Sequence, residues 1–331
     1  MSKEKMKAAV IGVGKMGLVH ASVLNTLPNI ELIAFCDKSA LIRRFLAGIV
    51  GKIRVFADVE RVLDLDVDII YVTTPIPSHY SVIKEIYSLR KPVNIFVEKT
   101  LASNYDDSLK LCELARDSKG VKMVGYMKRF AVTFQKAREL VNQDAIGQIS
   151  SFGAHAYSSD FFGVKEASKM PSNRGGVLSD LGSHVIDLAL WLFGDFEVQS
   201  TGQPGVTDIQ NTVNFKVRND DQIEGTFDVS WCKEGYHVPE FGLLIKGSKG
   251  KIVVDDDVVR LEPASGQSIQ WHRQDLNDNV GFLLGAPEYF REDEYFVESI
   301  LNGVNAEPSF VTASKVDYII GKVLEGPEKN E

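Results

Sequence analysis

Residues 7–17 read Lys-Ala-Ala-Val-Ile-Gly-Val-Gly-Lys-Met-Gly, and this stretch decides the fold of the first part of the chain. Its first half is apolar and predicts a short buried strand, whereas the residues that follow it predict a helix. The glycines between them have the spacing G-x-G-x-x-G. The first permits a tight turn, the second lets the backbone approach a pyrophosphate, and the third allows the helix to pack closely on the strand. The stretch therefore predicts a dinucleotide-binding loop made of Gly12, Gly14, Lys15, Met16 and Gly17.

An acidic residue stands where such a loop needs one. A second apolar strand is expected over residues 30–36, and Asp37 follows it, 20 residues after the last glycine of the loop. A carboxylate at this position accepts hydrogen bonds from the ribose hydroxyls of NAD and repels the 2′-phosphate of NADP. Lys38, Arg43 and Arg44 lie nearby and could instead pair with that phosphate. We predict NAD as the cofactor, with NADP as the alternative, and Lys38 beside it.

The order of expected strands and helices changes along the chain. Up to residue 125, apolar strands alternate with helical segments, which predicts parallel β-α-β units with helices on both faces of the sheet. We therefore expect a Rossmann domain over residues 1–125. Over residues 126–331 we expect an α+β domain with a large, mostly antiparallel open sheet. Its expected helices lie near residues 130–143, 178–193, 288–302 and 311–324, and its strands at 148–157 and between 196 and 272.

The bulk composition excludes several classes of function. The 331 residues include 37 Lys and Arg against 45 Asp and Glu, a formal charge of −8, and an acidic surface repels a nucleic-acid backbone. We expect neither a signal peptide nor a membrane span. Three widely spaced cysteines argue against a disulfide framework or a zinc site and favour a reducing compartment. The expectation is a cytoplasmic protein without a metal site, a nucleic-acid partner or a membrane anchor.

A loop follows the strongly apolar strand over residues 67–73. It reads Thr73-Thr74-Pro75-Ile76-Pro77-Ser78-His79. Ligands of open α/β sheets bind at the carboxyl ends of the strands, so this loop is expected to border the nicotinamide. A rigid proline turn with Ser78 as a helix N-cap is the plainer reading, and both can hold. The expected contacts come from Thr73, Thr74, Pro75 and His79.

Two further segments carry charge in apolar surroundings. Glu98 and Lys99 end an apolar strand, and Asp180 and His184 stand four residues apart on a predicted helix, so that they share one face. A histidine can take the proton of a hydroxyl as its carbon gives up hydride, and a lysine can stabilise the developing alkoxide. An aspartate can orient both. Taken alone, the helical pair also fits a capped helix with a satisfied histidine.

Together, these segments resemble the GFO/IDH/MocA family, named for glucose–fructose oxidoreductase, inositol dehydrogenase and a rhizopine-catabolism protein. The resemblance covers nearly the whole chain and includes Gly125–Phe130 and Gly175–Asp187. It implies a Rossmann domain, then a sheet domain that often packs against another subunit, hence a homodimer or homotetramer. It implies that His184 is the general acid and base, that Lys99 holds the reacting oxygen near the nicotinamide beside Glu98, and that Asp180 binds substrate or holds Lys99. Tyr126 and Arg129 match a segment that borders the substrate.

The chain departs from the family pattern at two positions. Thr100 stands where the family usually has a proline with a cis bond, so the Lys99–Thr100 bond is expected to be either trans or held cis. Arg174 stands where a glycine is common, and it could bind a substrate carboxylate or phosphate or be a solvated loop residue.

The resemblance implies an NAD(P)-dependent oxidoreductase that acts on a secondary hydroxyl of a sugar, inositol or nucleotide sugar. The alternatives are a relative that keeps NAD bound through a redox-neutral reaction and a regulator that only senses a nucleotide. Other polar residues are given no role. His20 is expected to pack rather than react, and the acidic runs Asp255–Asp257 and Glu292–Glu294 are expected to be solvated turns or helix starts.

Overall fold

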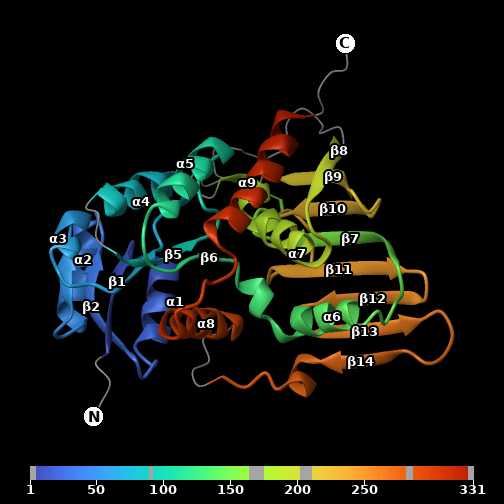
Figure 1. The fold of residues 1–331 in the computed structure, drawn as a ribbon, viewed down its shortest axis with the longest axis horizontal. Coiled ribbons are helices and arrows are strands. Elements are labelled where there is room, and N and C mark those ends of the chain that lie inside the picture. Colours follow the sequence, from blue (N-terminus) through green and yellow to red (C-terminus); the bar gives the residue numbers. More distant parts are fainter. Residues whose placement is uncertain (1–4, 89–91, 164–174, 202–210, 281–285, 327–331) are drawn as a thin grey trace. The chain divides into compact units, whose positions relative to one another are not determined.

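The computed structural model describes residues 5–88, 92–163, 175–201, 211–280 and 286–326 (Figure 1). The chain forms two compact units. The first unit comprises Met1–Tyr126 and Val280–Ser314, and the second comprises Met127–Asn279 and Lys315–Glu331. Arg174 and most of the loop before it lie outside the described residues. Among the helices that the structure describes, none combines the length and the apolar character that crossing a membrane requires.

The first unit is built on a parallel sheet with the strand order β3-β2-β1-β4-β5-β6. Ile11, at the end of β1, pairs with Cys36 of β2 on one side and with Val72 of β4 on the other. Strands β2 and β3 extend the sheet on one side of β1, and β4, β5 and β6 extend it on the other, so the strand order switches at β1. Ligands of doubly wound folds bind at such a switch point. The predicted Rossmann sheet is confirmed. Its elements are β1 (Met6–Ile11), α1 (Lys15–Leu24), β2 (Ile30–Cys36), α2 (Ala40–Ile49), β3 (Arg54–Phe56), α3 (Val59–Leu63), β4 (Ile69–Val72), α4 (His79–Ser88), β5 (Asn94–Glu98), α5 (Tyr105–Arg116) and β6 (Lys122–Gly125).

A helix from the C-terminal part of the chain completes this unit. α8 (Glu288–Asn302) packs along α1, and its fully buried Phe296 lies against the rings of Tyr71 and Phe96, with centroid distances of 5.9 and 5.7 Å. Glu292 and Asp293 on the same helix have no exposed surface. The expectation that the 292–294 acidic run is solvated is therefore wrong for these two residues, because the helix turns them toward the core.

The second unit is built on an eight-stranded sheet with the order β14-β13-β12-β11-β7-β10-β9-β8. β7 and β10 run parallel and the other neighbours antiparallel, which confirms the mostly antiparallel sheet. Burial alternates along β7, as expected when helices cover one face only. α7 packs on β7 and β11, and α6 packs on β12 and β13. The elements are α6 (Val132–Asn142), β7 (Ile149–Tyr157), α7 (Ser183–Phe193), β8 (Phe196–Thr201), β9 (Thr212–Asn219), β10 (Glu224–Ser230), β11 (Glu240–Gly247), β12 (Gly250–Asp255), β13 (Val258–Pro263) and β14 (Ile269–His272), with α9 (Phe310–Glu325) closing the chain.

Candidate active site

The glycine loop joins β1 to α1 in the geometry that its sequence predicts. Gly12 has a φ of +91°, and a Cβ atom there would lie 2.6 Å from the backbone nitrogen of Thr74. A Cβ atom at Gly17 would lie 2.1 Å from the carbonyl oxygen of Gly12. The Thr73 hydroxyl donates to that same oxygen at 2.6 Å. Glycine is therefore required at Gly12 by the close approach of the loop after β4, and at Gly17 by packing within the glycine loop.

Gly14 differs from the other two glycines because its surroundings are open. No heavy atom of the described residues lies within 4 Å of the place where its Cβ would be. α1 begins at the next residue, Lys15, and no side chain among those described caps its first turn. The free amide groups of a helix start are a ready site for an anion, and the space above Gly14 lets one approach. This part of the loop fits the pyrophosphate of a dinucleotide.

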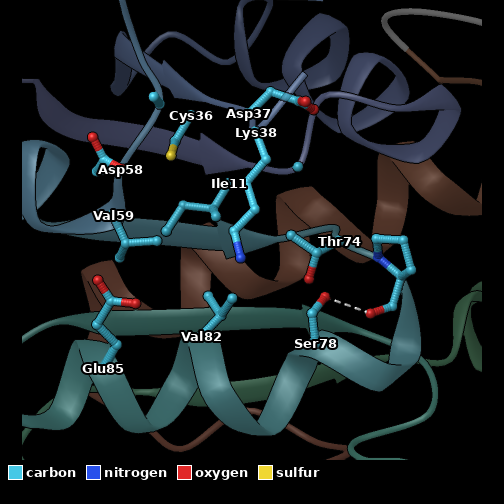
Figure 2. Close-up of a pocket in the computed structure, with 13 residues that line it drawn as sticks. Ile11, Cys36, Asp37, Lys38, Asp58, Val59, Thr74, Ser78, Val82 and Glu85 are labelled. Atoms are coloured by element: carbon cyan, nitrogen blue, oxygen red, sulfur yellow. Dashed lines mark hydrogen bonds between the residues drawn. The ribbon is translucent and has the colours of Figure 1, made fainter. Parts of the chain in front are cut away.

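A cavity of about 360 Å³ lies beside the loop, at the carboxyl ends of β1, β2 and β4 (Figure 2). Asp37 forms part of its wall and is itself fixed. Its Oδ2 accepts a hydrogen bond from the amide of Val13 at 2.8 Å, and its Oδ1 accepts one from the amide of Ser39 at 2.8 Å. Figure 2 shows the Lys38 side chain reaching into the cavity. Asp37, at the end of the second strand, is therefore hydrogen-bonded to the glycine loop.

Most of the charge around this cavity is negative. Asp58 and Glu85 line it together with Asp37, and Lys38 is the cation among the lining residues. Arg43, which the sequence left open as a partner for a phosphate, instead donates from Nη1 to the carbonyl oxygens of Asp37 and Lys38, each at 2.8 Å. Its guanidinium therefore holds the backbone at the end of β2.

The loop after β4 lies on the other side of the cavity, where Thr74 and Pro75 contribute to the lining. Ser78 donates from its hydroxyl to the carbonyl oxygen of Pro75 at 2.7 Å, in a short 3₁₀ turn that leads into α4. His79 has no exposed surface. Its Nδ1 lies 2.8 Å from the carbonyl oxygen of Thr100, and its Nε2 lies 2.8 Å from that of Thr74. Burial lowers the pKa of His79, so the ring is neutral and donates to one of the two oxygens. His79 therefore braces two loops from inside, and its contact with a cofactor stays a prediction.

Lys99 follows β5 and is half-buried, whereas Glu98 before it is buried. The amide of Lys99 donates to Oε2 of Glu98 at 3.1 Å. The peptide bond between Lys99 and Thr100 is cis, which decides between the two expectations for this bond. The Thr100 hydroxyl donates to the carbonyl oxygen of Ala102 at 2.9 Å. The threonine thus occupies the place of the family's proline and makes a hydrogen bond of its own.

The second unit holds Asp180 and His184 at the start of a helix that differs from the expected one. Residues Leu178–Gly182 form a π-helical turn, and α7 continues from it. Asp180 lies in the wider turn and is half-buried, while His184 lies in the first turn of α7 with 5% of its surface exposed. The His184 ring stands edge-on to Phe241 of β11, with centroids 5.1 Å apart. Single π turns inside α-helices are frequent at functional sites.

Two of the residues expected near the substrate are tied into the interior. Arg129 forms a bidentate ion pair with Asp187 of α7, at 2.7 Å from Nε and 2.6 Å from Nη2, and both side chains are buried. Tyr126 has no exposed surface. The Arg129 pair fixes the helix that carries His184, one turn before Asp187, so the arginine supports the histidine whether or not it also meets a substrate.

One ion pair of the second unit was missed at the sequence level. Nζ of Lys128 lies 2.6 Å from Oδ1 of Asp256 and 4.9 Å from the centre of the Phe241 ring, whose other neighbour is His184. Lys128 is buried. Asp256 lies in the turn between β12 and β13, as expected, but its side chain is only 20% exposed because it pairs with Lys128. The sequence carries no signal for this ion pair, because no local pattern joins residues 128 positions apart.

Comparison with protein families matches both halves of the chain. Residues 6–126 match the model of the oxidoreductase family with an NAD-binding Rossmann fold, and residues 134–253 match the GFO/IDH/MocA C-terminal domain. The chain belongs to the GFO/IDH/MocA family. The resemblance inferred from the motifs is therefore confirmed, and the glycine loop and Asp37 lie inside the NAD-binding part of the match.

Named relatives of this family member act on sugars and polyols. The chain is 23% identical to inositol 2-dehydrogenase of Rhizobium meliloti over 326 residues, which is 92% of this chain and 91% of that protein. It is 28% identical to D-glucoside 3-dehydrogenase of Escherichia coli over 205 residues, 60% of this chain and 57% of that protein. Several other curated relatives are matched over little more than half of their length.

Solved structures show the same fold. Levoglucosan dehydrogenase in complex with NADH and levoglucosan is similar with a TM-score of 0.84 at 20% identity, and 97% of each chain is covered. An oxidoreductase from Agrobacterium radiobacter in complex with NAD⁺, L-tartaric acid and magnesium is similar with a TM-score of 0.83 at 16% identity, covering 99% of this chain and 97% of that one. These likenesses extend over both units of the GFO/IDH/MocA chain.

Proposed function

We propose that this chain is an NAD-dependent dehydrogenase that oxidises a secondary hydroxyl group of a sugar, an inositol or a nucleotide sugar. The observation that carries the proposal is the cavity beside the glycine loop, with open space above Gly14 and an anchored Asp37 in its wall. Bound NAD would supply the hydride acceptor. The names of the relatives, inositol 2-dehydrogenase and D-glucoside 3-dehydrogenase, support a substrate with several hydroxyl groups.

The charges of the cavity favour NAD over NADP. Among the described residues that line it, three carboxylates, on Asp37, Asp58 and Glu85, stand against the amine of Lys38. A 2′-phosphate would bring more negative charge into these surroundings, and Arg43 is engaged by backbone carbonyls. The ribose hydroxyls of NAD can instead donate to Asp37. Gly12, Gly14, Lys15, Met16, Gly17 and Lys38, with Thr73, Thr74, Pro75, His79, Glu98 and Lys99, are proposed to form or support this cofactor site.

The proposed chemistry needs one proton acceptor and one group that stabilises a developing alkoxide. We assign the first role to His184 and the second to Lys99, with Asp180 orienting the reacting hydroxyl. Lys99 belongs to the first unit and the other two residues to the second, so their joint action is part of the proposal. Tyr126, Arg129 and Arg174 are proposed to border the substrate. A homodimer or homotetramer and a reducing, cytoplasmic environment belong to the same proposal, and the cysteines are free.

Reduction of NAD at 340 nm across a panel of inositols, sugars, glycosides and nucleotide sugars tests the proposal. We expect turnover with at least one class, and losses in kcat of about a hundredfold or more for Lys99→Ala and for His184→Ala. His272→Ala is the matched control, because His272 is exposed on the edge strand β14. Strands β13 and β12 separate β14 from β11, on which α7 packs. Binding of NAD without turnover of any compound would contradict a dehydrogenase. NAD that copurifies and appears only after denaturation would instead favour the redox-neutral reaction.

A further inference from the structure

A buried group of charged side chains lies directly beneath Lys99 in the first unit. His20 of α1 stands between two carboxylates. Its Nε2 lies 3.0 Å from Oε1 of Glu98, and its Nδ1 lies 2.8 and 3.0 Å from the two oxygens of Asp293. His20 and Asp293 have no exposed surface, and the Glu98 side chain is 11% exposed. Three elements far apart in sequence, α1, β5 and α8, thus meet in one ionic row.

The geometry requires a particular protonation state of the histidine. Carboxylate oxygens face both ring nitrogens, and only the imidazolium form carries a hydrogen on each. Burial lowers the pKa of His20, but the charge and hydrogen bonds of Asp293, followed by those of Glu98, outweigh burial and raise it well above 6.5. Burial also raises the pKa of Asp293, against the opposing charge of His20. We take the shared proton to lie on His20, because a carboxylate oxygen faces each of its ring nitrogens and the Asp293 carboxylate is stabilised by both His20 and Tyr71.

Aromatic rings surround the rest of the His20 side chain. Tyr71 of β4 and Phe96 of β5 stack near it, with centroids 5.4 and 4.9 Å away, and Tyr289 of α8 meets it edge-on at 6.0 Å. Burial, followed by the charges of Asp293 and Glu292, raises the pKa of Tyr71, so the phenol stays neutral. Within the described part of this pocket, the positive charge between the carboxylates is that of His20.

The ionic row ends at the backbone of Lys99. Glu98 uses one carboxylate oxygen for His20 and the other for the amide of Lys99, at 3.1 Å. One residue further on, the carbonyl oxygen of Thr100 lies 2.8 Å from Nδ1 of His79 on α4. The backbone around the proposed catalytic lysine is therefore contacted at two points by buried side chains, at the Lys99 amide by Glu98 of β5 and at the Thr100 carbonyl by His79 of α4.

We propose that His20 is a positioning residue for Lys99: it is held as a buried imidazolium by Asp293, it fixes the Glu98 side chain, and Glu98 in turn sets the backbone from which Lys99 projects. The inference rests on the proposed function for the role of Lys99. A buried charge is costly unless it is paired, so the row is stable only when all three members are present. The competing explanation is a staple that joins α1, β5 and α8 without any effect on Lys99.

The first experiment needs no substrate. In the full-length protein with ¹⁵N-labelled histidine, we expect His20 to show two protonated ring nitrogens at pH 8. Asp293→Asn keeps the size of the side chain and removes its charge, and it should convert His20 to the neutral form at that pH. The amide signal of Lys99 should shift in Asp293→Asn and in His20→Gln. A neutral His20 at pH 8 in the wild type, or an unmoved Lys99 amide in both variants, overturns the proposal.

The second experiment uses the reaction. His20→Gln should lower kcat about tenfold to a hundredfold, the range expected when a catalytic group is misplaced by about 1 Å, while the Kd of NAD changes less than about threefold. Asp293→Asn should give a smaller loss of kcat, and His272→Gln should give none. An equal kcat for folded His20→Gln and wild type overturns the positioning role. If the wild type turns over no hydroxyl substrate, the proposed function fails, and the histidine and Lys99 signals still decide the positioning.

Discussion

Two glycines of the same loop should respond oppositely to alanine, because one is enclosed by backbone and the other is open. Gly17→Ala would place a Cβ atom 2.1 Å from the carbonyl oxygen of Gly12 and 2.9 Å from Oγ1 of Thr73. The Thr73 hydroxyl already uses that carbonyl oxygen, so the turn must open to admit the methyl group. Gly14→Ala meets nothing within 4 Å among the described residues, and its φ of −78° suits any residue.

The expected magnitudes follow from these contacts. Overpacking costs about 1–3 kcal/mol, so Gly17→Ala should lower the midpoint of thermal unfolding by roughly 2–12 °C. At Gly14 the loss is at most about 1 kcal/mol, from replacing a favoured residue at a helix start. The new methyl group would, however, occupy the space proposed for the pyrophosphate. Gly14→Ala should therefore weaken NAD binding by at least about tenfold, or about 1.4 kcal/mol.

Calorimetric titration with NAD and thermal unfolding without it separate the two effects. Gly48→Ala is the matched control, since Gly48 is exposed on α2 with nothing within 4 Å; it should leave the Kd unchanged and alter stability by at most about 1 kcal/mol in the favourable direction. If Gly14→Ala binds NAD as tightly as wild type, the loop is not the pyrophosphate site. If Gly17→Ala unfolds at the wild-type temperature, the packing argument is wrong.

Three further outcomes are expected. Burial, followed by the charge of Asp37, raises the pKa of Cys36 to about 11, so at pH 8 iodoacetamide should modify Cys36 more slowly than the other two cysteines, as read by peptide mass spectrometry. Asp187→Asn leaves Arg129 buried without its counter-charge and should cost about 3–5 kcal/mol in urea unfolding, whereas an unchanged midpoint would mean that water replaces the carboxylate. The raised pKa of His20 stabilises the fold fully below pH 6.5, and this contribution is lost as pH rises through the folded pKa. His20→Gln should therefore lose most stability near pH 6 and least at alkaline pH, and a pH-independent loss would count against the charged histidine.

The sequence predicts those parts of the structure that depend on local pattern. Alternating strands and helices are enough for the parallel sheet, and the glycine spacing with Asp37 places the cavity at its switch point. Both signals are residue types at fixed positions: glycines in the turn after the first strand, and an acidic residue at the end of the second strand. The same holds for the segment around His184, although its first turn is π-helical rather than α-helical, because periodicity alone does not register one extra residue in a turn.

The partners of the buried charges could not be predicted from the sequence. His20 and Asp293 are 273 positions apart, and Arg129 and Asp187 are 58 apart. An acidic run on an amphipathic helix is a solvated face in most proteins, and only the packing of α8 along α1 shows that Asp293 points inward. Periodicity does not distinguish a solvated acidic run from a buried one, because both give the same sequence pattern.

The two buried histidines of the first unit show why partner chemistry decides function here. His20 and His79 are both without exposed surface, and burial lowers the pKa of each. His79 faces neutral carbonyl oxygens, which leave the lowered pKa in place, whereas His20 faces carboxylates, which reverse it. One ring is therefore neutral and the other charged, although both lie near the same turn: His79 contacts the Thr100 carbonyl, and His20 reaches the Lys99 amide only through Glu98. A lysine fixed between a neutral and a charged support keeps its place over the pH range in which neither ring titrates, so within that range a change of kcat with pH should come from groups other than these two histidines.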